Sequence, residues 1–156
     1  MDAFHKLVRK YGPLAARLLL AQLFILSGCG KIGAFANTAA HMADMGLPLS
    51  RLLLILTIAL EVGGGALLAL GWRARWIATA LFGFTFLATL VFHAFWNAEG
   101  TFFGSQLNNF MKNLAIMGGM LYVMAYGAGP FSLGRDSVEA DAPPTDIRGK
   151  KRGPKK

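Results

Sequence analysis

The chain has 156 residues, of which 54% are hydrophobic and only 15% are charged, and its mean hydropathy is +0.46. Soluble domains carry about 25% charged residues, so this composition excludes an ordinary soluble domain. The net charge of +8 does not indicate nucleic-acid binding, because the basic residues gather at the chain ends and in short loops instead of forming one face of a folded domain.

Four apolar stretches are long enough to cross a bilayer, which takes about 20 helical residues. They cover approximately residues 13–31, 49–71, 75–96 and 107–127. Four such helices in so short a chain leave no polar faces for a soluble surface. The sequence therefore predicts an all-α fold, a four-helix transmembrane bundle over residues 13–134. A basic cytoplasmic lead-in (1–12) precedes the bundle, and a disordered basic cytoplasmic tail (135–156) follows it.

The first span begins with Pro13, a residue that suits the first turn of a helix, and contains the chain's single cysteine, Cys29. The sequence Leu26-Ser27-Gly28-Cys29 matches a bacterial lipoprotein cleavage site. Cleavage there would leave three spans and move the basic tail to the wrong side of the membrane. We therefore expect Cys29 to remain within an uncleaved helix. A single cysteine also excludes an internal disulfide and an electron relay through cysteine pairs.

The three connections between the spans differ in character. The first, residues 32–48, alternates apolar and polar residues, which predicts a short interfacial helix ending at Gly46-Leu47-Pro48. The second, residues 71–76, is tight, so the second and third spans must be antiparallel neighbours; the third, residues 97–106, is expected to be a loop. Most of the 16 basic residues lie on the side shared by both termini and the second connection. The positive-inside rule therefore places both termini in the cytoplasm.

Glu61 lies near the middle of the second span. A carboxylate at that depth costs about 2.5–3.5 kcal/mol on insertion scales, so intramembrane acids are usually paired with a cation or take part in function. From their estimated depths, we expect Arg17 or Lys112 to be its partner. Lys31 is expected to extend toward the membrane surface.

Helical spacing groups further polar residues on single faces of the other spans. Charged residues in spans usually face the interior of a bundle, so these faces should converge on a polar pocket in the outer half of the membrane, with Glu61 at its floor. Three aromatic residues, Phe82, Phe86 and Phe92, are expected in or beside its walls. The candidate ligand-binding residues are Arg17, Lys31, Glu61, His93, Asn109, Lys112 and Asn113.

Each candidate also has a purely structural interpretation, which the sequence leaves open. In that interpretation, Glu61 forms an ion pair and has no other role. His93 donates a hydrogen bond to a carbonyl within the bundle, and Asn109 and Asn113 join helices through hydrogen bonds. The sequence contains no metal-ligand spacing, phosphate-binding loop or Ser-His-Asp constellation. A single histidine at bundle depth does not support haem ligation. No catalytic or metal-binding residue is therefore assigned.

The order and spacing of several motifs resemble the DoxX family. These motifs are Phe24 through Gly28 to Lys31, Gly46-Leu47-Pro48, Glu61 followed by Gly64-Gly65, Phe92-His93, and Asn109 with Lys112-Asn113. The resemblance runs from about Arg17 to Gly127 and implies a four-helix bacterial plasma-membrane protein. The family takes its name from a thiosulfate:quinone oxidoreductase subunit, and the wider group is similar to eukaryotic membrane cargo receptors and assembly factors.

Two classes of function follow from this resemblance. In the first, the chain is a subunit or accessory of a quinone-linked membrane redox system, and it holds a quinone or a small anion. Lys31, His93, Lys112 and the two asparagines then bind ligand oxygens, Glu61 relays protons, a quinone is the candidate cofactor and a membrane protein is the candidate partner. In the second, the chain is a non-enzymatic assembly, cargo-binding or transport component. Retention of a quinone by the purified protein discriminates between the two classes.

Overall fold

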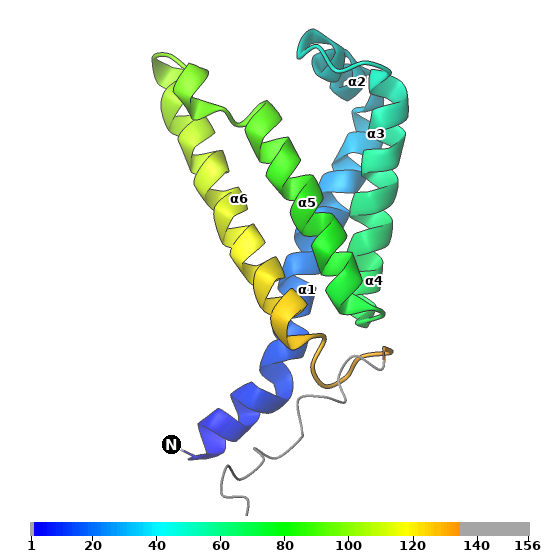
Figure 1. The fold of residues 1–156 in the computed structure, drawn as a ribbon, viewed down its shortest axis with the longest axis vertical. Helices are drawn as coiled ribbons and strands as arrows, with labels where there is room; N and C mark the ends of the chain where they lie inside the picture. Colours follow the sequence, from blue (N-terminus) through cyan, green and yellow to red (C-terminus); the bar gives the residue numbers. More distant parts are fainter. Residues whose placement is uncertain (1, 135–156) are drawn as a thin grey trace, which may run out of the picture.

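The structure is a computed structural model that describes residues 2–134, and the tail expected to be disordered lies outside them. The described residues form α1 (Asp2–Gly33), α2 (Phe35–Asp44), α3 (Ser50–Ile58), a π-helical turn (Ala59–Gly63), α4 (Gly64–Leu70), α5 (Ala74–Phe92), a 3-10 turn (Phe95–Asn97) and α6 (Thr101–Tyr126). Because α3, the π-helical turn and α4 follow one another without a break, they form one long helix. The predicted four-helix bundle is therefore confirmed, and the helix predicted in the first connection is α2 (Figure 1).

Three of the four long helices contain a stretch that is long and apolar enough to span a membrane. They are Asp2–Gly33, Ser50–Leu70 and the stretch Ala74–Asn97. The fourth, α6, has 26 residues, but its first half carries polar side chains such as Asn109 and Lys112. The polar half of α6 lies at the end of the bundle where the helices separate, as described below.

The first helix starts earlier than expected. α1 begins at Asp2 and continues through Pro13, so the basic lead-in is part of the helix instead of a separate segment. A proline in a helix removes one hydrogen bond to the carbonyl four residues before it. That carbonyl belongs to Arg9, in a stretch whose residues are all exposed, so water or lipid headgroups can satisfy it and the helix can continue.

The fourth long helix also starts earlier than expected, at Thr101 instead of residue 107. Its first turns pack against the 3-10 turn through aromatic rings. The ring centroid of Phe95 lies 6.0 Å from that of Phe103 and 5.1 Å from that of Phe110. These contacts outweigh the weak helix propensity of Gly104, one of the two glycines in the stretch that was expected to be a loop.

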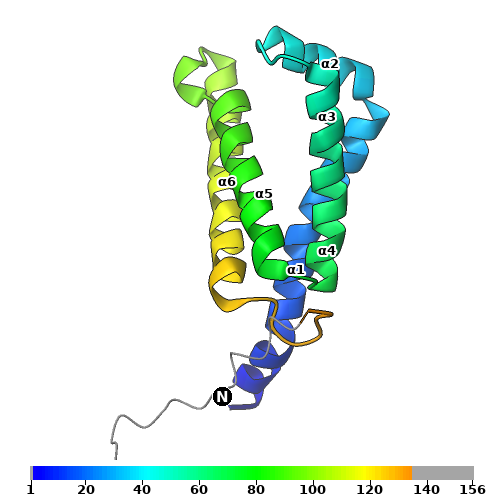
Figure 2. The same cartoon turned by 45° about the vertical axis from the view of Figure 1, so that its right-hand side comes forward.

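The four long helices pack as two pairs, α1 with α3–α4 and α5 with α6, which are close at one end and diverge toward the other (Figure 2). The close end contains the turn between α4 and α5, and we call it the turn end; the opposite end, which carries α2, is the α2 end. The main core lies toward the turn end and comprises Ala21, Phe24, Leu68, Ala74, Ala78, Leu81, Met120, Val123 and Ala128. A smaller core packs α2 on α3 through Ala39, Met42 and Leu54. The space between the two cores is where the polar residues gather.

Close packing of α1 on α4 depends on a glycine. A Cβ on Gly65 would lie 2.8 Å from Cγ1 of Ile25 and 3.1 Å from the carbonyl oxygen of Ala21. Small residues at helix interfaces in membranes allow backbones to approach in this way. The contact fixes the depth of α1 relative to the helix that carries Glu61.

Residues 127–134, which follow α6, close the turn end of the bundle, and we call this segment the strap. The backbone N–H groups of Leu133 and Gly134 donate to carbonyls at the end of α4, over 3.0 and 3.2 Å. The guanidinium of Arg17, which is 1% exposed, donates to the carbonyl of Ala128 and, over 2.8 Å, to that of Phe131. Arg17 therefore holds the strap against α1.

Candidate functional site

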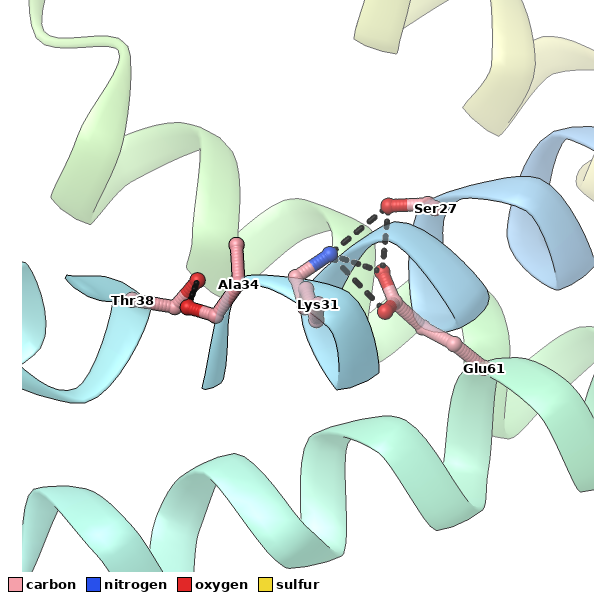
Figure 3. Close-up of polar contacts among 5 residues, drawn as sticks. All are labelled: Ser27, Lys31, Ala34, Thr38 and Glu61. Carbon is pink, nitrogen blue, oxygen red and sulfur yellow. Dashed lines mark hydrogen bonds and ion pairs between the residues drawn. The ribbon is translucent and has the colours of Figure 1, made fainter. Parts of the chain in front are cut away.

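Glu61 is the centre of a closed triad of polar side chains. It lies in the π-helical turn, and its side chain is only 4% exposed. The ammonium Nζ of Lys31 lies 2.9 Å from its Oε1 and 2.8 Å from its Oε2 (Figure 3). The hydroxyl of Ser27 donates to Oε1 over 3.1 Å and accepts from Lys31 over 2.7 Å. The buried carboxylate is thus neutralised by a cation and held by hydrogen bonds from two residues of α1.

The expectation that Arg17 or Lys112 pairs with Glu61 is wrong, because Lys31 is its partner. Nor does Lys31 extend fully to the surface, since its side chain is only 26% exposed. α1 packs mainly against the π-helical turn and α4, and much less against α3. α3 therefore extends beyond the end of α1, and Glu61 lies level with the last turns of α1, where Lys31 can reach it.

Two local features bring Glu61 against α1. A π-helical turn carries an extra residue compared with an α-helical one, and such turns are frequent at functional sites; it changes which side chains of this helix face α1. Gly28 then permits the close approach, since a Cβ there would lie 2.6 Å from Cγ2 of Val62 and 3.2 Å from Cβ of Glu61. Ser27 and Lys31 are four residues apart and so share one face of α1.

A cavity of about 540 Å³ lies beside the triad, between the two helix pairs. Its volume falls within the range of about 300–1,000 Å³ that is usual for small-molecule sites. Part of the lining is apolar or aromatic: Leu23, Phe24, Met42, Phe84, Ala88, Phe92 and Ile116. The rest is polar: Ser27, Lys31, Thr38, His41, Thr57, Glu61, Thr85, His93, Gln106, Lys112 and Asn113. The cavity therefore suits a molecule with both apolar surface and polar atoms.

The α5–α6 side of the cavity is a polar wall held by side-chain hydrogen bonds. Nδ1 of His93 lies 2.9 Å from Oε1 of Gln106. Nδ2 of Asn113 donates to Oγ1 of Thr89 over 2.9 Å, and Thr89 donates in turn to the carbonyl of Thr85. Because each of the two side-chain pairs joins α5 to α6, the polar groups of this wall are held in place before any ligand arrives.

Most of the candidate residues from the sequence meet at this cavity. Those in its lining are Lys31, Glu61, His93, Lys112 and Asn113. Arg17 is not among them, because it binds the strap at the turn end. Asn109 accepts a hydrogen bond from Lys112 over 3.0 Å but does not line the cavity.

Of the three aromatic residues that were expected in or beside the walls of the cavity, only one lines it. Phe92 lines the cavity, whereas Phe82 packs against the main core and Phe86 points away, 47% exposed. Two other aromatic residues, Phe24 and Phe84, line the cavity instead. The phase of α5 was therefore misjudged by a fraction of a turn, since Phe84 and Phe86 lie on different sides of the helix.

Sequence reasoning also missed five polar lining residues: Ser27, Thr38, His41, Thr85 and Gln106. A usable signal existed for two of them: Ser27 precedes Lys31 by four residues, and Thr85 precedes Thr89 by four, the spacing of one helix face. The other three gave no such signal. Thr38 and His41 lie in the first connection, and Gln106 lies in the stretch that was expected to be a loop.

The two lysines of the cavity are not equivalent. The ammonium of Lys31 has three N–H groups, and Ser27 and the two oxygens of Glu61 accept from them. Lys112 is exposed, and the one hydrogen bond that its ammonium makes within residues 2–134 goes to Asn109. Lys112 thus has donors left for a ligand, whereas Lys31 must first give up a bond within the triad. Residues 2–134 contain no cluster of His, Cys, Asp or Glu that could hold a metal ion.

Comparison with known proteins gives related membrane proteins. Inner membrane protein YqjF of Escherichia coli K12 is 41% identical over 130 residues, which are 83% of this chain and 95% of the relative. Inner membrane protein YphA of the same organism is 32% identical over 122 residues, or 78% of this chain and 87% of the relative. A Surfeit locus protein 4 homolog of Schizosaccharomyces pombe is 28% identical over 127 residues, 80% of this chain but only 37% of that protein. No solved structure matches.

The profile of the DoxX family matches residues 12–94. This range contains the triad, the π-helical turn and His93, and it ends before the polar half of α6. The match covers more than half of the chain, and the two E. coli relatives cover most of both chains. The chain therefore belongs to the DoxX family of membrane proteins.

Proposed function

We propose that this multi-pass inner-membrane protein is a subunit or accessory of a quinone-linked redox system, and that its cavity binds the quinone headgroup. The observation that supports the proposal is the lining of the cavity, in which N–H donors of α6 face aromatic and aliphatic side chains. A quinone headgroup is a flat apolar ring with two carbonyl oxygens, so it requires both kinds of surface. A protein partner in the membrane would exchange electrons with it.

Lys112 and Asn113 are the donors best placed for the quinone oxygens. The ammonium of Lys112 keeps N–H groups beyond the one given to Asn109. The amide of Asn113 has two N–H groups and uses one for Thr89. Phe84 and Phe92 would contact the ring of the headgroup. Affinity in this arrangement comes from apolar contact, and orientation comes from the donors of α6.

Glu61 is the carboxylate in this cavity, and in the proposal it exchanges protons with the ligand. A bound quinone supplies two-electron, two-proton chemistry. Within the triad, Lys31 and Ser27 both donate hydrogen bonds to the carboxylate of Glu61. When Glu61 takes up a proton, its attraction for Lys31 falls, and the ammonium of Lys31 becomes free to donate to the ligand. Proton uptake would thus be coupled to a second contact with the quinone.

Retention of quinone by the purified protein tests this proposal. Protein purified in mild detergent should carry nearly stoichiometric quinone, measured by solvent extraction and mass spectrometry. Lys112→Met should weaken the affinity for quinone about tenfold or more and so lower the bound amount, because a hydrogen bond from a charged group contributes about 1.5–3 kcal/mol. Asn113→Leu should also lower it. The matched control is Asn108→Leu, since Asn108 is exposed on the same helix and does not line the cavity.

One observation favours the alternative function, a non-enzymatic assembly, cargo-binding or transport component. The triad satisfies its own charges, as a purely structural ion pair would. If the wild-type protein carries no quinone, or if Asn108→Leu lowers the bound amount as much as Lys112→Met does, the redox proposal fails and this alternative takes its place.

The orientation in the membrane is part of the proposal. The positive-inside rule places both chain ends in the cytoplasm and the α2 end outside. Green fluorescent protein fused after the last residue should fluoresce, and alkaline phosphatase fused after Glu99, near the α2 end, should be active. The inverse pattern would reverse the orientation and would open the cavity toward the cytoplasm.

A further inference from the structure

The first part of α1 projects beyond the bundle. Arg17 marks the level of the α4–α5 turn, because a Cβ on Gly71 would lie 2.8 Å from its Nη1. Residues 2–11 of α1 extend past this level (Figure 2), and every one of them is exposed. The whole of α1 has 32 residues and is about 48 Å long, which exceeds the roughly 30 Å of a hydrocarbon core. The projecting residues therefore emerge from the hydrocarbon.

The projecting segment is amphipathic. One face is an apolar stripe whose members are spaced by three and four residues: Phe4, Leu7, Val8 and Tyr11. The opposite face carries three cations: Lys6, Arg9 and Lys10. Phe4 is 67% exposed and Leu7 is 56% exposed. An apolar stripe left this open indicates that another surface covers it in the membrane.

The turn end also carries residues that are typical of the membrane interface. Trp72 and Trp76 are exposed beside the α4–α5 turn, and the guanidinium of Arg73 stacks over the ring of Trp72, 5.1 Å from its centroid. Tyr126, at the end of α6, is exposed as well. Tryptophan and tyrosine concentrate at headgroup level. The bilayer surface therefore lies at the turn end, where the projecting segment begins.

We propose that residues 2–11 are a binding surface for anionic phospholipid headgroups. The segment lies along the bilayer with its apolar stripe at the boundary between headgroups and acyl chains, and its cations attract lipid phosphates. Charge complementarity favours lipid over a protein partner, because three cations outnumber the single acid, Asp2. Continuity favours it too, since the segment leaves the span at the membrane surface.

The junction of the segment with the span allows this arrangement. Pro13 removes a hydrogen bond of the helix, and prolines are the commonest sites of helix kinks; Gly12 precedes it. The ring of Tyr11 stacks on Phe131 of the strap, with 5.6 Å between centroids and 6° between planes. Bending at Gly12-Pro13 can lay the segment on the lipid, and it would separate Tyr11 from Phe131.

Site-directed fluorescence in the full chain tests the proposal. In a Cys29→Ser background, a bimane label is attached at Leu7→Cys in the stripe or at His5→Cys outside it. The protein is placed in nanodiscs of brominated phosphatidylcholine, with or without phosphatidylglycerol. The label at residue 7 should be quenched more strongly than the label at residue 5, and phosphatidylglycerol should increase the difference.

Neutralising the cations should remove this dependence on lipid charge. The combined variant Lys6→Gln, Arg9→Gln, Lys10→Gln should lower the ratio of docked to undocked segment about 100-fold, at about fivefold for each cation near an anionic surface. Arg51→Gln, an exposed cation at the α2 end, is the matched control and should change nothing. The altered residues are exposed, so the bundle should fold in every variant, which circular dichroism checks.

Three results would each overturn the proposal. The first is equal quenching at residues 5 and 7. The second is quenching at residue 7 that is the same with and without phosphatidylglycerol. The third is a blue-shifted but unquenched label at residue 7, which would show that protein, such as a second copy of the chain, covers the stripe.

Discussion

Glu61→Gln is expected to lower the free energy of unfolding by about 3 kcal/mol, measured by titrating the detergent-solubilised protein with sodium dodecyl sulfate. The substitution leaves the ammonium of Lys31 without its counterion. Breaking a buried ion pair costs about 3–5 kcal/mol, and the lower end applies because Lys31 keeps 26% of its side chain exposed. The amide retains some hydrogen bonding to Ser27, so the loss should come mainly from the unpaired charge.

A double-mutant cycle identifies the partner. Lys31→Met combined with Glu61→Gln should cost less than the sum of the two single changes, with a coupling energy of about 1–3 kcal/mol. The control cycle replaces Lys31 with Lys112, which lines the same cavity without bonding to Glu61, and its coupling should be close to zero. Coupling to Lys112 but not to Lys31 would contradict the triad.

Gly28→Ala is expected to lower the free energy of unfolding by about 1–3 kcal/mol, as overpacking in a close-packed interior does. The added methyl group would lie 2.6 Å from Cγ2 of Val62, a side-chain atom that can rotate away. It would also lie 3.2 Å from Cβ of Glu61 and 3.3 Å from the backbone nitrogen of Val62, and these can move only if the π-helical turn moves. α1 must then shift, and the bond from Lys31 to Glu61 lengthens.

Gly30→Ala is the matched control, because a Cβ at Gly30 meets nothing within 4 Å. Both substitutions replace glycine by alanine in the same helix, so any gain in helix propensity is shared. The same titration should therefore show a loss for Gly28→Ala and none for Gly30→Ala. Equal effects would mean that the contact between α1 and the π-helical turn is looser than described.

The periodic and compositional features of the sequence predict the bundle. A long apolar span in lipid must satisfy its backbone hydrogen bonds internally, and an α-helix does so. Of the face expected on α6, Lys112 and Asn113 line the cavity, whereas Asn109 does not. Spacing along one helix is a local property, and it needs no knowledge of the neighbouring helices. The same reasoning misplaced the residues of α5 by assigning Phe86 instead of Phe84 to the cavity.

The partner of Glu61 could not be predicted, because depth was counted from helix ends. That count assumes that neighbouring helices end in one plane, whereas α3 extends beyond α1. The offset is set by the contacts of Gly28 and Gly65 with the facing helices. These contacts join residues far apart in the chain, so the spacing of residues along one helix does not reveal them. The π-helical turn is equally invisible, since its register depends on packing. Arg17 was assigned to the cavity for the same reason, although its partners, the strap carbonyls, lie more than one hundred residues away in the chain.

The main core and the strap close the cavity on the side of the turn end. Between the cavity and the turn end lie the main core, with Leu68, Leu81 and Met120 fully buried, and then the strap held by Arg17. A molecule that enters beside Glu61 must leave through the same mouth or sideways between helices into the lipid. The cavity is therefore a binding site that is closed at one end, and not a channel. For a molecule to cross the membrane, Arg17 would have to release two carbonyls and the residues of the main core would have to separate.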